Sequence, residues 1–107
     1  MMNKGSIILI CLVSMTLTKE LRYEDVIEKT VGRLRDGEYH EAIEMLNLLE
    51  PYFDDDVLAK GQIAEVMFLK GTSYHGLRDV ENALEQYQKA VQLQKDLPGA
   101  WKNMALI

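Results

Sequence analysis

The chain has 107 residues, of which 48% are apolar, and a formal net charge of −5. This length suits one small domain with a modest core. Lysines and arginines are dispersed and form no basic stripe along a helical face, so we expect no nucleic-acid partner. The single cysteine, Cys11, rules out a disulfide within the chain and a cysteine-based metal cluster, so packing must supply the stability.

The chain begins with an apolar segment, residues 1–18. Lys4 precedes an uncharged run from Ile7 to Leu17, and small hydroxyl residues follow before the charged Lys19. This order is typical of a secretory signal peptide, and the run is shorter than the roughly 20 residues of a membrane-spanning helix. The sequence therefore predicts cleavage and export, to the periplasm or as a secreted protein. The alternative is an apolar helix that covers the next helices, in a cytoplasmic or membrane-associated protein.

Residues 23–50 carry two stripes of apolar side chains. Spacings of three and four residues within each stripe predict amphipathic helices, and Asp36-Gly37 separates the two stripes. The segment therefore predicts a helical hairpin. The stripes consist of Tyr23, Val26, Ile27, Thr30, Val31 and Leu34, then of Tyr39, Ala42, Ile43, Leu46 and Leu49.

Residues 51–57 interrupt this pattern. Pro51 disfavours continuation of the preceding helix, and Asp54 or Asp55 can cap a new one. The run Asp54-Asp55-Asp56 lacks the alternating ligands and central glycine of a calcium loop. We therefore expect a short turn followed by an early start of the next helix.

Residues 63–91 repeat the hairpin pattern, with small residues at fixed distances from tyrosines. Gly71 on the first helix and Ala83 on the facing helix would let the two backbones approach closely, with tyrosines filling the space beyond. No segment alternates with the period of a β-strand. The sequence therefore predicts an all-α fold. The two stripes are Ile63, Ala64, Met67, Phe68, Gly71 and Tyr74, then Val80, Ala83, Leu84, Tyr87, Ala90 and Val91.

Residues 64–97 resemble a tetratricopeptide repeat in length and in the spacing of their small and aromatic residues. Trp101 stands 34 residues after Met67, where a following repeat would place its aromatic residue. Residues 23–50 resemble a more degenerate copy, with Ala42 at the matching small position. The positions assigned by this resemblance to repeat packing are Ala42, Gly71, Tyr74, Ala83, Tyr87, Ala90 and Trp101.

The resemblance implies a right-handed superhelical array of antiparallel helix hairpins, an α-solenoid of about two and a third repeats. The first repeat would span about 23–50, the insertion 51–57, the second repeat 64–97 and a partial third repeat would start at 98. All of them would belong to one domain, residues 19–107.

Proteins of this family are non-catalytic scaffolds that hold a peptide or helix of a partner protein in a concave groove lined by first helices. The lining expected here is largely apolar with acidic edges, which favours an apolar or helical ligand over the C-terminal carboxylate that some members bind. By similarity the groove residues are Ile27, Val31, Glu65, Phe68, Leu69, Thr72, His75 and Asn103.

Residues for catalysis or metal binding do not form a recognisable pattern. His40 and His75 belong to different hairpins, and neither has a carboxylate or cysteine at metal-ligand spacing on one face. No glycine-rich phosphate loop occurs. We therefore expect no enzyme activity, no metal and no cofactor.

The sequence ends in "WKNMALI", a short apolar helix pattern that lacks a pairing helix. Arrays of this kind generally need about three repeats for stability. Two alternatives to a self-sufficient scaffold follow. The chain could be a fragment of a longer array with little independent function, or it could form homo-oligomers through its C-terminal helix.

Overall fold

A computed structural model describes residues 22–54 and 57–107 of the chain. The expected signal peptide, residues 1–18, lies outside the described residues. Within them the structure contains helices and no β-strand, so the all-α prediction is confirmed. None of the described helices has the length and apolar character needed to span a membrane. The elements are α2 (Tyr23–Arg35), α3 (Tyr39–Asn47), the 3-10 helix η1 (Glu50–Tyr52), α4 (Lys60–Gly76), α5 (Val80–Leu93) and α6 (Pro98–Leu106).

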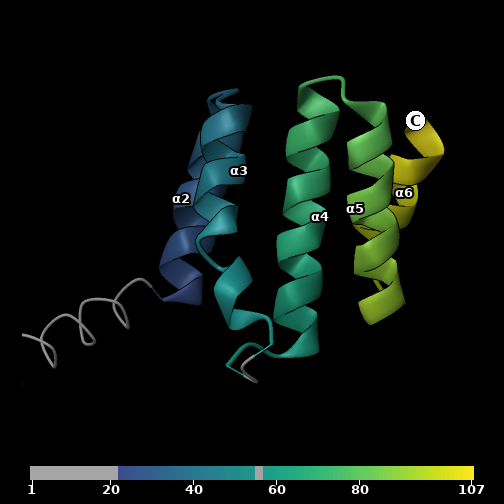
Figure 1. The fold of residues 1–107 in the computed structure, drawn as a ribbon. Coiled ribbons are helices and arrows are strands. Elements are labelled where there is room, and N and C mark those ends of the chain that lie inside the picture. The colour runs from purple at the N-terminus through teal and green to yellow at the C-terminus, as the bar shows by residue number, and fades with distance from the viewer. Residues whose placement is uncertain (1–21, 55–56) are drawn as a thin grey trace, which may run out of the picture.

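The helices form two antiparallel hairpins, α2 with α3 and α4 with α5, and α6 packs against α5 (Figure 1). Each helix contacts its neighbour in the sequence, and α3 joins the first hairpin to α4. The structure therefore confirms the array of helical hairpins expected from the two pairs of apolar stripes.

The turns that close the two hairpins share one backbone geometry. Gly37 has a φ of 75° in the first turn, and Arg78, 41 positions later, has a φ of 63° in the second. In both turns the next residue donates its amide to a carbonyl five positions back, which satisfies a free carbonyl at the helix end. These bonds run from Glu38 N to Arg33 O at 2.8 Å and from Asp79 N to Tyr74 O at 2.9 Å.

The segment between the hairpins contains η1, with Pro51 in its first turn, and an early start of α4 at Lys60. The residue before α4 is Ala59, and its amide donates to the side chain of Gln62 at 2.9 Å. The expected cap by Asp54 is therefore wrong, because the chain continues beyond it before the helix begins. Asp55, the alternative cap, lies outside the described residues.

Two clusters of buried side chains form the core. The first lies between the hairpins and includes Val26, Leu46 and Val66, whereas the second joins α5 to α6 through Tyr87 and Ala100. Phe68 of α4 packs against both clusters, so it links the two halves of the core.

The close contact at Gly71 is made with the ring of Tyr87, and not with the facing Ala83. A Cβ atom at Gly71 would lie 2.6 Å from the Cδ1 and Cε1 atoms of Tyr87, so the glycine makes room for the ring of this tyrosine. Ala83 and Ala90 are fully buried, as expected for the facing helix. Gly76 makes room in the same way for the ring of Tyr39, a contact between hairpins that the sequence analysis did not predict.

Candidate functional site

The candidate site is a face built by the first helix of each hairpin together with α6, which we call the first-helix face. Residues three, four or seven positions apart share one side of a helix, so each helix contributes one row of side chains. The α2 and α4 rows adjoin, because these helices contact each other. The face comprises Glu24, Ile27, Glu28 and Val31 of α2, Glu65, Phe68, Thr72 and His75 of α4, and Asn103 of α6.

A hydrogen bond joins the α2 and α4 rows. The hydroxyl of Tyr23 donates to the Glu65 carboxylate across the boundary between the hairpins. Burial raises the pKa of Tyr23 strongly, and the hydrogen bond and negative charge of Glu65 raise it further, with a smaller effect from Glu24. The hydroxyl therefore remains protonated, and able to donate this bond, well above neutral pH.

The apolar part of the face is only partly exposed. Ile27 and Phe68 are half-buried and pack against the core between the hairpins, and the side chain of Val31 is 38% exposed. Leu69, which the resemblance assigned to the groove, is only 8% exposed and belongs to the core. Leu69 therefore does not line the face, because the first hairpin covers its side of α4.

The polar part of the face is organised by a buried residue. The Tyr87 hydroxyl donates to Oγ1 of Thr72 at 3.4 Å and accepts a bond from Nδ2 of Asn103 at 3.3 Å. The ring of His75 meets the Tyr87 ring edge-on, with centroids 6.4 Å apart. Three expected groove residues thus gather around a tyrosine that the sequence analysis assigned to packing. A buried tyrosine hydroxyl needs hydrogen-bond partners. The burial expected for Tyr87 could therefore have predicted that polar groups gather around it.

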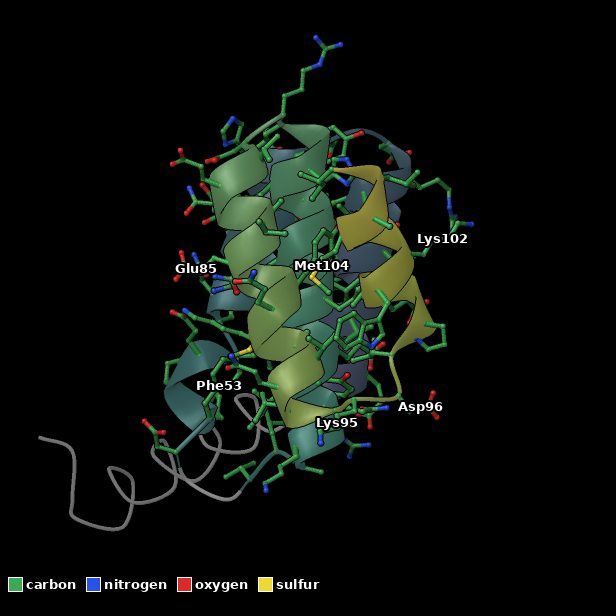
Figure 2. All side chains as sticks on the ribbon, turned by 90° about the vertical axis from the view of Figure 1, so that its right-hand side faces the viewer. Phe53, Glu85, Lys95, Asp96, Lys102 and Met104 are labelled. Atoms are coloured by element: carbon green, nitrogen blue, oxygen red, sulfur yellow. The ribbon has the colours of Figure 1, made fainter. Side chains whose placement is uncertain are left out.

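Helix α6 packs one side against α5 and leaves Trp101 on its other side partly exposed. Figure 2 shows Met104 pointing from α6 towards the other helices, while Lys102 points away from them. Ala100 is fully buried against α5, whereas Trp101 is 53% exposed and donates its Nε1–H to the carbonyl of Lys95 at 2.8 Å. Ala100 and Met104 therefore supply apolar packing between α6 and α5, whereas Trp101, which the resemblance assigned to repeat packing, stays half exposed.

The described part of the chain brings together no group of three or more metal-ligating side chains. His40 lies exposed on α3, while His75 lies against Tyr87. The chemistry that the first-helix face offers is apolar contact, hydrogen bonding by neutral groups and attraction of cations by exposed carboxylates.

Comparisons with known proteins identify one segment of the chain. Residues 64–97 match the family model described as the tetratricopeptide repeat. None of the curated proteins or solved structures compared with the chain matches it. The matched residues comprise most of α4, the turn at Arg78 and all of α5, which are the elements that enclose Gly71 and Tyr87. Residues 64–97, which form most of the second hairpin, therefore match the tetratricopeptide repeat.

Proposed function

We propose that the chain is a non-catalytic interaction module that binds a peptide or helical segment of a partner protein on the first-helix face. Repeats of this class generally act as protein-binding scaffolds. The observation that supports this site is the continuity of partly exposed apolar side chains across two hairpins. Ile27 of α2 and Phe68 of α4 pack against the same core cluster, and Val31 lies one turn beyond Ile27 on α2. Exposed carboxylates lie on the same two helices.

Binding on this face would combine apolar burial with hydrogen bonds at its edge. A ligand side chain placed against Ile27 and Val31 would remove apolar surface from water, which is the main favourable contribution to such contacts. The Tyr23–Glu65 bond and the bonds of the Tyr87 hydroxyl hold the rows in place before a ligand arrives. A preformed surface lowers the entropy lost on binding.

A matched pair of variants tests the proposal. Val31→Glu introduces a charge into the apolar row, and we expect it to weaken partner capture by about tenfold or more, because a carboxylate would lose hydration on contact. Val80→Glu makes the same change at a valine of similar exposure, 46% against 38%, at the start of α5. We expect Val80→Glu to bind as the wild type does.

Capture of binding partners by immobilised full chain, measured for both variants, checks this expectation. Equal capture by Val31→Glu and wild type would refute the first-helix face as the binding site. Circular dichroism of each variant confirms that the comparison is made between folded proteins.

Self-association through α6 is a second candidate, supported by the exposure of Trp101, Leu106 and Ile107. In a longer array a following helix would cover the same surface. Trp101 is the single tryptophan of the chain, so its fluorescence reports on this helix alone. If copies associate through α6, we expect a blue shift of its emission as protein concentration rises, together with a dimer in sedimentation. A monomer with constant emission would contradict self-association.

A further inference from the structure

Three carboxylates of the first-helix face have no basic partner among the residues that the structure describes. Glu24, Glu28 and Glu65 are exposed, and none takes part in an ion pair there. The ion pairs of the described residues are Arg33–Glu38, Lys70–Glu50 and Lys89–Glu85.

These carboxylates lie next to the apolar row and on both of its helices. Glu24 and Glu28 are one turn apart on α2, and Ile27 lies between them on the same side. Glu65 belongs to α4 but accepts the hydroxyl hydrogen of Tyr23, which places it beside the start of α2. Burial is the main cause of the raised pKa of Tyr23, and the nearby Glu65 and Glu24 raise that pKa further.

Interaction with the helix dipole accounts for only one of these three carboxylates. Glu24 lies in the first turn of α2, where a negative charge interacts favourably with the helix dipole. Glu28 lies beyond that turn, and Glu65 is the sixth residue of α4. The basic group on the same side of α2 is Arg35, in its last turn. Charge therefore changes sign along the face, from acidic at the start of α2 to basic at its end.

We propose that the partner segment bound on this face carries lysine or arginine next to apolar side chains, with the basic group at the end where α2 and α4 begin. This inference rests on the proposed function and adds the chemistry of the partner. A basic side chain near Glu24, Glu28 and Glu65 would gain three attractive charges, while an acidic one would be repelled. Apolar side chains of the same segment would then lie against Ile27, Val31 and Phe68.

Selection of short random peptides displayed on phage, with the immobilised full chain as target, tests the inference. We expect the recovered peptides to be enriched in lysine or arginine adjacent to apolar residues. The double variant Glu24→Gln/Glu28→Gln should bind the recovered pool about three- to thirtyfold more weakly, the effect of losing two exposed ion pairs. High salt should weaken wild-type binding more than binding by this variant.

A control variant separates local from overall charge. Glu44→Gln/Glu81→Gln removes two exposed carboxylates from the second helices, α3 and α5, and changes the net charge equally. We expect it to bind the pool as the wild type does.

The outcomes distinguish the two proposals. Suppose that the Val31→Glu variant no longer binds the recovered peptides. If those peptides show no enrichment in lysine or arginine, or if the control variant binds them as weakly as Glu24→Gln/Glu28→Gln does, the inference is overturned and the proposed function stands. A pool that Val31→Glu binds unchanged, or failure to recover any specific peptide, would overturn both.

Discussion

Tyr87 has two roles that depend on different parts of its side chain. Its ring occupies the space above Gly71, so it sets how closely α4 and α5 approach. Its hydroxyl bonds to Thr72 and Asn103, so it also holds α6 against the hairpin. One fully buried residue therefore fixes the relative positions of three helices.

The tight contact between Gly71 and Tyr87 predicts how a substitution at Gly71 changes the free energy of unfolding. A methyl group there would collide with the Tyr87 ring, and overpacking of this kind costs about 1–3 kcal/mol. Alanine gains about 1 kcal/mol in helix propensity over glycine. We expect Gly71→Ala to lower the free energy of unfolding by up to about 2 kcal/mol, measured by denaturant titration of the helical signal.

Gly32 provides the matched control for this substitution. It lies within α2, and nothing would lie within 4 Å of a Cβ atom added there. Gly32→Ala should therefore raise the free energy of unfolding by up to about 1 kcal/mol. A stabilising effect of both substitutions would contradict the tight Gly71–Tyr87 contact.

At the scale of elements, the turns that close the hairpins are equivalent in backbone but not in sequence. The positive-φ position is glycine in the first turn and Arg78 in the second. A non-glycine residue in this region costs about 1–2 kcal/mol, because its Cβ atom approaches the backbone. The second hairpin therefore keeps a local strain that the first one avoids.

Substitutions at the two positive-φ positions test whether the two turns share this backbone geometry. We expect Arg78→Gly to raise the free energy of unfolding by about 0.5–1 kcal/mol, since strain is relieved at some cost in chain entropy. Gly37→Ala should lower it by about 1 kcal/mol. Thermal melting of the two variants checks both signs, and destabilisation by Arg78→Gly would argue against the left-handed turn.

At the scale of the whole molecule, stability accumulates through contacts between neighbouring elements. The helices α2 to α5 pack into two hairpins, which contact each other through α3 and α4, whereas α6 packs mainly against α5. Elements with few contacts to their neighbours open at lower free energy than well-packed ones.

This arrangement predicts that α6 detaches before the hairpins unfold. Trp101 fluorescence should change at a lower denaturant concentration than the helical circular dichroism signal, which arises mostly from α2 to α5. Asn103→Ala should widen the gap between the two transitions, because it removes a bond from α6 to Tyr87. Coincident transitions would show instead that the described helices unfold as one unit.

The sequence by itself determined the elements and their order. Apolar residues at spacings of three and four mark all four hairpin helices, because a helix that buries one side must repeat with this period. The small and aromatic positions of residues 64–97 also identify the repeat, since their spacing is a local property of the chain.

Only the tertiary structure decided which side chains each position meets. Leu69 is buried because the first hairpin covers it, and Trp101 is half exposed because α6 docks through Ala100 instead. The bond from Tyr23 to Glu65 joins residues 42 positions apart, and no local pattern encodes it. Burial and hydrogen bonding across helices depend on how the hairpins stack, which the period of one helix does not specify.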